Sequence, residues 1–357
     1  MVISSQQLQA MMDKGQGVAA RLLDRLPKIA QERIVRSLDY PYHYPELDPF
    51  VKCLMAVQLK QGKTGIVRED IAQSRIFFEQ SMQLLKSKPT AIRQVEDIRL
   101  SLHSGIVQAR HYHPAPAKKL PLIIFYHGGG FLIGSLDTHD EYCRLLAKHA
   151  HAQVLSVAYP LAPEHHPSQI VQVCEDALAW AHQHSKQLRI LKKRIAVAGD
   201  SAGGNLAAVV AQRSADKVYV PQAQLLVYPA MDFKSRHPSY FAYKDGLVLT
   251  DGDIELVTYH YVERHEIALD DPLISPTYGN LKNLPPTYLI TAGHDVLHDE
   301  AEIYAHKLRQ HAVTVKYVEY LDQTHGFINM SFVSRRAKKI SIEMCKNFRK
   351  FWDRPRS

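Results

Sequence analysis

The sequence predicts an α/β protein with a mostly parallel central sheet and helices on both of its faces. From about residue 95 to the end, short apolar runs alternate with stretches of helical periodicity. The runs are continuously apolar, which is typical of strands that are buried on both faces of a parallel sheet. With 357 residues, of which 46% are hydrophobic and 22% charged, the chain is long enough to bury a large core.

Residues 1–90 are expected to form helices ahead of this sheet. Apolar side chains recur there with a helical period, in runs that contain Val18, Leu22, Leu23 and Leu26 and then Ile71, Phe78, Met82 and Leu85. Residues 39–50 contain three prolines and three tyrosines, so they are predicted to be an irregular connection. We therefore expect a helical N-terminal region at 1–90 and a main domain at 91–357.

The main domain is expected to start with an antiparallel edge, because residues 97–102 and 106–112 resemble two strands joined by a tight turn. Residues 230–270 separate two strands by more than a crossover requires and are expected to be an insertion over the strand ends, with a helix at 251–261. Residues 332–352 form an amphipathic pattern whose basic side chains indicate a solvated helix face. The other predicted strands are 122–126, 154–158, 195–198, 225–228, 287–291 and 315–320.

Composition argues against several classes of function. The net charge is +8, but the basic residues are scattered, apart from those near the C-terminus, so no nucleic-acid partner is expected. No run approaches the roughly 18 apolar residues of a membrane span, and the N-terminus lacks the pattern of a leader, so we expect a cytoplasmic protein without stable membrane insertion. The widely spaced cysteines are expected to be free thiols, and a homodimer is left open. The cysteines are Cys53, Cys143, Cys174 and Cys345.

The run Gly199-Asp200-Ser201-Ala202-Gly203-Gly204 follows a predicted strand and opens a helical pattern. Glycines on both sides of a serine are typical of a sharp turn in which strand and helix come too close for side chains. Such a turn presents the serine hydroxyl at a helix N-terminus, where unpaired N–H groups favour negative charge. Taken alone, the pattern fits an ordinary strand-to-helix turn equally well.

A second glycine run, His127-Gly128-Gly129-Gly130, directly follows the predicted strand 122–126. Its exposed backbone suits the stabilisation of an oxyanion, for which Gly129, Gly130 and Ala202 would donate their N–H groups. A phosphate-binding loop is disfavoured because no lysine stands beside the glycines.

A serine nucleophile needs a base and a carboxylate that orients the base. Asp295 follows the predicted strand 287–291, and His325 follows the strand 315–320, so both are expected at the same sheet edge as Ser201. His294 and His298 are four residues apart, but the remaining pattern of a zinc site is missing. We therefore expect neither a metal nor another cofactor.

Together, these motifs resemble the hormone-sensitive-lipase-like branch of the α/β-hydrolases, also called bacterial family IV esterases. The resemblance covers residues 95–330 and implies an α/β-hydrolase fold with a helical cap, the triad Ser201, Asp295 and His325, and the oxyanion donors named above. Two positions depart from the usual pattern, Pro160 and Val296. The motifs are HGGGF at 127–131, LAPEH at 161–165, GDSAGGN at 199–205, DPLISP at 271–276, LPP at 284–286, AGHDVLHDE at 292–300 and HGF at 325–327.

The expected function is that of a serine carboxylesterase, which hydrolyses small-molecule esters with short or medium acyl chains through an acyl-enzyme. An amidase or deacetylase of the same fold is the first alternative. A non-catalytic receptor for small molecules is the second, although the presence of His325 argues against it.

Overall fold

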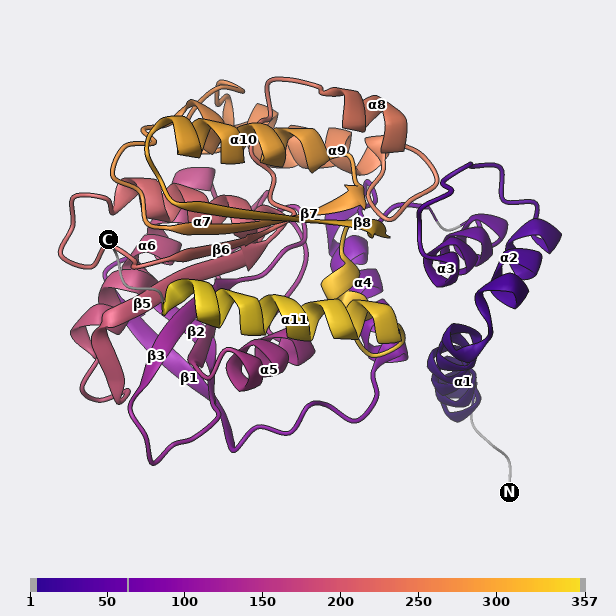
Figure 1. Cartoon of the computed structure of the whole chain (residues 1–357), viewed down its shortest axis with the longest axis horizontal. Helices are drawn as coiled ribbons and strands as arrows, with labels where there is room; N and C mark the ends of the chain where they lie inside the picture. Colours follow the sequence, from indigo (N-terminus) through magenta and orange to yellow (C-terminus); the bar gives the residue numbers. More distant parts are fainter. Residues whose placement is uncertain (1–4, 63, 354–357) are drawn as a thin grey trace.

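The computed structural model describes residues 5–62 and 64–353, without the side chains of residues 5–14, 192 and 193. Its centre is a twisted eight-stranded sheet (Figure 1) with the strand order β1-β2-β4-β3-β5-β6-β7-β8. All of the predicted strands are present, most of them a few residues longer than expected. The strands are β1 (Gln94–Leu102), β2 (Gly105–His113), β3 (Leu120–Tyr126), β4 (Gln153–Val157), β5 (Ile190–Asp200), β6 (Gln224–Val227), β7 (Thr287–His294) and β8 (Val315–Thr324).

The pairing confirms the predicted mixed sheet. β1 pairs with β2 and β2 with β4 in antiparallel register, whereas the pairs from β4 through β8 are parallel. The carboxyl ends of the parallel strands therefore meet at one edge, where open α/β sheets place their ligands.

Helices cover both faces of the sheet, as predicted (Figure 1). On one face lie α6 (Pro167–Gln183), α7 (Ala202–Arg213) and α10 (His298–Gln310), and on the other lie α5 (Asp140–His149) and α11 (Arg335–Trp352). Successive residues of a strand serve opposite faces. In β6, for example, Leu225 packs in the core on the side of α5 and α11, whereas Leu226 packs in the core on the side of α6, α7 and α10.

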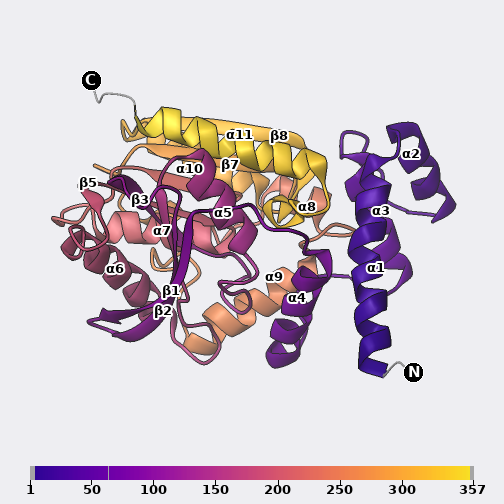
Figure 2. The same ribbon diagram turned by 90° about the horizontal axis from the view of Figure 1, so that it is seen from below.

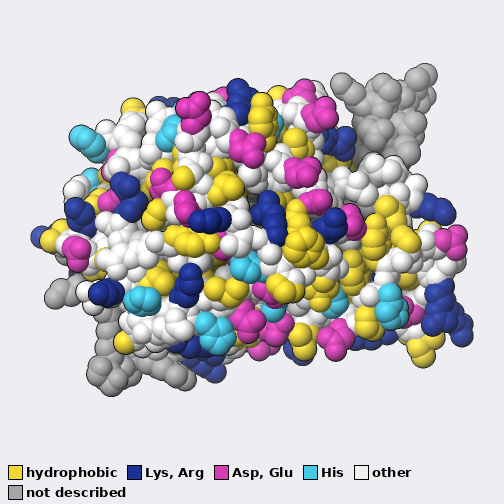
Figure 3. Space-filling model, turned by 90° about the horizontal axis from the view of Figure 1, so that it is seen from above, with side chains coloured by type: hydrophobic (Ala, Val, Ile, Leu, Met, Phe, Trp, Pro, Cys, Tyr) yellow, Lys and Arg dark blue, Asp and Glu magenta, His cyan; other side chains and the backbone are white. Residues whose placement is uncertain are grey.

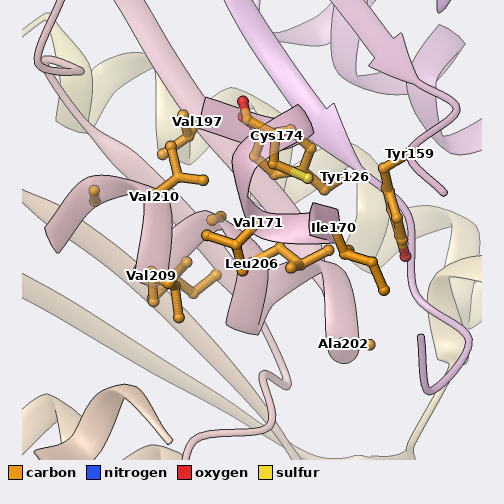
Figure 4. Packing of buried hydrophobic residues seen from close by; sticks show 14 of the residues in the cluster. Tyr126, Tyr159, Ile170, Val171, Cys174, Val197, Ala202, Leu206, Val209 and Val210 are labelled. Carbon is orange, nitrogen blue, oxygen red and sulfur yellow. The ribbon is translucent and has the colours of Figure 1, made fainter. Parts of the chain in front are cut away.

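The interface of α6 and α7 with the sheet is dense (Figure 4). Ile170 and Cys174 of α6 pack around Leu206 of α7 and Val197 of β5, and all four are fully buried. This packing fixes the first turn of α7, and with it the residue that precedes the helix.

The N-terminal region is helical, as predicted, and residues 39–48 are irregular. Its helices are α1 (Ser5–Arg25), α2 (Lys28–Ser37), α3 (Pro49–Lys60) and α4 (Ile71–Leu85). α1, α2 and α3 lie together at one end of the molecule (Figure 2). The hydroxyl groups of Tyr40 and Tyr44 donate to the carbonyls of Gly246 and Asp245 at 2.5 and 2.9 Å, which ties the irregular connection to the 230–270 insertion.

The apolar face predicted for the first of these helices is confirmed only at Leu23, which is half-buried and packs against the core. Val18, Leu22 and Leu26 are 47%, 56% and 40% exposed. α1 instead packs through small residues, because a side chain at Gly17 would meet the carbonyl of Leu84. A close helix approach through small residues leaves the larger ones on the outside.

Two helix limits also differ from the predicted ones. In the insertion, α8 (Pro238–Tyr243) precedes α9 (Asp251–Val257), and the expected helix continues after Val257 as a π-helical turn over Thr258–Val262. The Thr258 hydroxyl donates to the Ile254 carbonyl at 2.7 Å and competes there with regular backbone bonding. α11 begins at Arg335 because Ser334 caps it, accepting a hydrogen bond from the Ala337 N–H at 3.1 Å.

Within the described chain, no helix combines the length and the apolar character that crossing a bilayer requires. The face seen from above, over α8 and α10, mixes acidic, basic and hydrophobic side chains (Figure 3). No basic stripe runs across the described residues on this face.

Candidate active site

Ser201 occupies a strained turn between β5 and α7. Its φ is +53° and its ψ is −121°, a conformation that side chains rarely adopt. The flanking glycines are required by close approach, because a Cβ at Gly199 would meet the carbonyl of Gly203 and a Cβ at Gly203 would meet the carbonyl of Tyr126. The turn therefore holds the serine between β3, β5 and α7 at the carboxyl edge of the sheet.

The structure brings the three predicted polar residues together. His325 Nε2 lies 2.9 Å from Ser201 Oγ, and His325 Nδ1 lies 2.7 Å from Asp295 Oδ2. Asp295 is further fixed because its Oδ1 accepts a hydrogen bond from the Leu297 N–H at 3.0 Å. All three residues are buried. This serine-imidazole-carboxylate chain can remove a proton from the hydroxyl and hold it on the imidazole.

The glycine run after β3 adjoins the turn of Ser201, since a Cβ at Gly203 would also meet the His127 carbonyl. Gly129 and Gly130 have φ values of +122° and +59°, and a Cβ at Gly130 would lie 2.5 Å from Val257 of α9. Among the described residues, none accepts a hydrogen bond from the N–H groups of Gly129, Gly130 or Ala202. Free N–H donors close to a serine hydroxyl would suit a developing oxyanion.

A buried polar layer supports the glycine run. Asp200 Oδ1 accepts a hydrogen bond from the Gly128 N–H at 2.9 Å and lies 3.4 Å from His139 Nε2. The other oxygen, Oδ2, accepts a hydrogen bond from the Tyr228 hydroxyl at 3.4 Å, and the Tyr228 ring lies 4.7 Å from that of His325. Asp200 thus connects the glycine run with Tyr228, which lies beside His325.

Charge in this layer is balanced locally. Burial acts to raise the pKa of Asp200, but His139 and the Gly128 N–H outweigh it and hold the pKa below its usual value. His127 stacks on Tyr159, whose hydroxyl donates to the His127 carbonyl at 2.6 Å. Burial, together with the neighbouring His139, lowers the pKa of His127 to about 4, so this imidazole is neutral at pH 7. The sequence had no signal that singled out His139 among 20 histidines.

A cavity of about 630 Å³, counting the space that is open to solvent, extends from Ser201. Its wall is mostly apolar and comes from the segment between α3 and α4, the glycine run and the 230–270 insertion. Polar groups on the wall include Glu300, Asp232 and Arg236, none of which the sequence analysis had assigned to the site. The apolar side chains include Ile66, Val67, Phe131, Phe233, Leu249 and Val257.

The histidines considered as metal ligands do not share a helix face, because His294 ends β7 and His298 begins α10. Within the described residues, His298, Asp299 and Glu302 do bring ligand atoms within 4.8 Å of one another. However, His298 Nδ1 lies 2.8 Å from Asp299 Oδ1, and its Nε2 lies 2.7 Å from Glu319 Oε1. Both ring nitrogens of His298 therefore contact carboxylates, so the cluster is explained by ion pairs and needs no metal.

Comparisons with known proteins agree with this geometry. A family described as alpha/beta hydrolase fold matches residues 123–329. Carboxylic ester hydrolase LipN of Mycobacterium tuberculosis is 38% identical over 80% of this chain and 77% of its own. Ethyl acetate hydrolase of Pseudomonas putida is 32% identical over 74% of this chain and 85% of its own.

Solved structures are similar over nearly their whole length. An esterase of Pyrobaculum calidifontis matches with a TM-score of 0.77 and 34% identity, over 83% of this chain and 97% of that one. A thermostable esterase from Pseudomonas putida matches with a TM-score of 0.82 and 27% identity, over 88% of this chain and all of that one, 100%.

Proposed function

Because this chain belongs to the hormone-sensitive-lipase-like branch of the α/β-hydrolase fold family, we propose that it is a serine carboxylesterase. The observation that carries the proposal is the 2.9 Å contact between Ser201 Oγ and His325 Nε2 at the mouth of a mostly apolar cavity. A hydroxyl in contact with a base, next to free N–H donors, is suited to acyl transfer.

In the first half of the proposed reaction, Ser201 attacks the ester carbonyl while His325 Nε2 accepts the hydroxyl proton. Asp295 keeps the imidazole in the tautomer that leaves Nε2 free and stabilises the cation that forms. The N–H groups of Gly129, Gly130 and Ala202 stabilise the oxyanion, and each such donor is worth about 10²–10³ in rate. His325 then protonates the leaving alkoxide, which leaves an acyl group on Ser201.

In the second half, water takes the place of the alcohol. His325 accepts a proton from the water as it attacks the acyl-enzyme, and the same N–H groups stabilise the second oxyanion. The carboxylic acid leaves when the proton returns to Ser201. Apart from the ester and water, these proposed steps use only side chains and backbone groups of this chain.

The cavity bears on substrate size. Residues 1–90 and the insertion at 230–270 act together as a cap, and they contribute Ile66 and Val67 from one side and Phe233, Leu249 and Val257 from the other. An apolar cavity of about 630 Å³, part of which is open to solvent, favours short and medium chains, because a much longer chain could not be buried in it. The partners of this protein are thus small-molecule esters.

Four free cysteines, all buried, are in keeping with a reducing compartment, so the site of action is the cytoplasm. The cysteines are Cys53, Cys143, Cys174 and Cys345.

The proposal is tested with p-nitrophenyl esters from acetate to palmitate, with the p-nitroanilide of the best acyl group measured alongside. We expect the highest kcat/KM for chains of about four to six carbons and a far lower value for palmitate and for the anilide. Ser201→Ala serves as the control for background hydrolysis. Faster turnover of the anilide would favour the amidase alternative, and no turnover above the Ser201→Ala background would favour a receptor.

A further inference from the structure

Glu300 is a buried carboxyl group in the substrate cavity to which the hydrolytic mechanism gives no task. It lies in the first turn of α10, is 6% exposed and lines the same cavity as Ser201. Burying a carboxyl group in a mostly apolar wall is costly unless its polar atoms are used. Its hydrogen bonds indicate how they are used.

The two oxygens of Glu300 have different surroundings. Oε1 accepts hydrogen bonds from the N–H groups of Met231 and Asp232, at 2.6 and 3.2 Å. Among the described residues, none donates a hydrogen bond to Oε2, and this oxygen is not sealed away from solvent. One oxygen therefore anchors the backbone that follows β6, while the other is free for a molecule in the cavity.

The charges around Glu300 favour its neutral form. No lysine, arginine or histidine of the described residues forms an ion pair with it. Arg236 and Tyr240 also line the cavity, but the guanidinium lies over the Tyr240 ring, 4.7 Å from its centre. The groups that face Glu300 are Asp232 from the insertion and Asp295 after β7. Burial, with a smaller contribution from these two carboxylates, raises the pKa of Glu300 to about 8.

The position of the proton follows from the hydrogen bonds. Because Oε1 already faces two N–H donors, the proton of the neutral acid belongs on Oε2. Oε2 then presents an O–H donor to the cavity. A ligand with an oxygen acceptor at the right place would gain a hydrogen bond that a purely hydrocarbon chain cannot make.

We propose that Glu300 is a specificity-determining residue whose Oε2–H donates a hydrogen bond to an oxygen in the substrate chain. The substrates it selects are esters with an ether, keto or second ester oxygen in the chain that enters the cavity. This inference rests on the proposed esterase function and extends it to a substrate class. Glu300 takes no part in bond making or breaking.

The test compares the wild type with Glu300→Gln and Glu300→Met. Glutamine keeps both an acceptor for the backbone and a donor for the cavity, whereas methionine keeps the length and loses both. Each protein is assayed with p-nitrophenyl hexanoate and with three analogues of the same length in which an ether oxygen replaces carbon 3, 4 or 5. Dividing each ether rate by the hexanoate rate, and then comparing proteins, cancels the intrinsic reactivity of the esters.

For at least one ether position, we expect the kcat/KM ratio of the wild type to exceed that of Glu300→Met by about three- to tenfold, the usual worth of one hydrogen bond. Glu300→Gln should stay within about twofold of the wild type. Equal ratios in the three proteins at every ether position would overturn the proposal. Hexanoate turnover in all three proteins keeps this outcome separate from a failure of the esterase function itself.

A pH series provides a second test if Glu300→Met does not fold. In the wild type the donor is present below about pH 8 and is lost as Glu300 ionises above it, so the ether preference should fall between pH 7 and 9. In Glu300→Gln it should remain constant. Any effect of pH on the catalytic steps that both esters share changes the two rates alike and cancels in the ratio. An ether preference with the same pH dependence in both proteins would contradict the assignment.

Discussion

The carboxyl edge of the sheet and the N-terminal helices differ in how closely their side chains are held and in how far they are buried. At the sheet edge, close backbone approach fixes the turn of Ser201, and His325 lies 2.9 Å from Ser201 and 2.7 Å from Asp295. By contrast, Leu22 of α1 and Leu26, which follows it, are exposed, and among the described residues before position 91 only Ile66 and Val67 line the cavity. Chemistry should therefore be sensitive to single atoms at the edge, while the helical region should tolerate change except at those two positions.

The sharpest contrast comes from the proposed triad. Ser201→Ala and His325→Ala should each lower kcat by at least about a thousandfold, because attack and proton transfer act as one unit. Asp295→Asn should cost less, and the double variant Ser201→Ala/His325→Ala little more than either single one. Steady-state kinetics with p-nitrophenyl butyrate measures this. A single variant that keeps a tenth of the wild-type rate would remove that residue from the mechanism.

The second contrast compares a glycine that has no room for a side chain with one that has room. Gly203→Ala should destabilise the protein by about 3 kcal/mol or more, because its Cβ would meet the Tyr126 carbonyl. The matched control is Gly252→Ala in α9, where a Cβ meets nothing within 4 Å. That change should be neutral or stabilise by up to about 1 kcal/mol. Urea unfolding of both variants checks the prediction, and equal losses would show that the turn is not held by close approach.

The third prediction concerns Asp200 in the buried polar layer that supports the glycine run, and the contribution of this residue to stability should depend on pH. Asp200→Asn should lower the free energy of unfolding by about 1.5–3 kcal/mol at pH 7, because the neutral amide loses the charge-assisted contacts that the carboxylate makes with the Gly128 N–H and with His139. The pKa of Asp200 is lowered in the folded protein, so its stabilisation is complete above about pH 4 and is lost at lower pH. Unfolding at pH 7, 5 and 3 should show the difference from the wild type shrinking only at the lowest pH. A constant difference would exclude this ionic contribution.

The smallest effect separates the cavity from the outer helices. Val67→Trp should fill part of the cavity and reduce turnover of hexanoyl relative to acetyl esters by about tenfold or more. Leu22→Lys, on the exposed face of α1, should leave the ratio unchanged. Chain-length profiles of both variants, measured on folded protein, test the division. A shifted profile in Leu22→Lys would show that α1 influences the cavity.

Features that depend on residues close together in the sequence could be predicted from it, whereas features that depend on contacts between distant segments could not. The sequence indicated Ser201 because its turn is encoded within five residues, and Asp295 and His325 because each follows an apolar strand; their catalytic roles stay a prediction. The sheet edge then brings these local signals together. The cap and its limits stay a prediction.

Other features depend on packing between distant segments. Glu300 and His139 acquire their surroundings from Met231 and Asp200, which no local pattern connects to them. The face of α1 was predicted wrongly at Val18 and Leu22 because periodicity detects large apolar residues, whereas the contact with α4 requires the missing side chain of Gly17.

The most direct test of the account is covalent labelling of the intact protein with a fluorophosphonate, followed by peptide mass spectrometry. An activated serine should react within minutes and carry the phosphonyl group on Ser201 alone, and His325→Ala should react far more slowly because its hydroxyl has lost the base. Unlabelled Ser201 in folded wild-type protein, or labelling that is equally fast without His325, would contradict the claim that this serine is the nucleophile of an esterase.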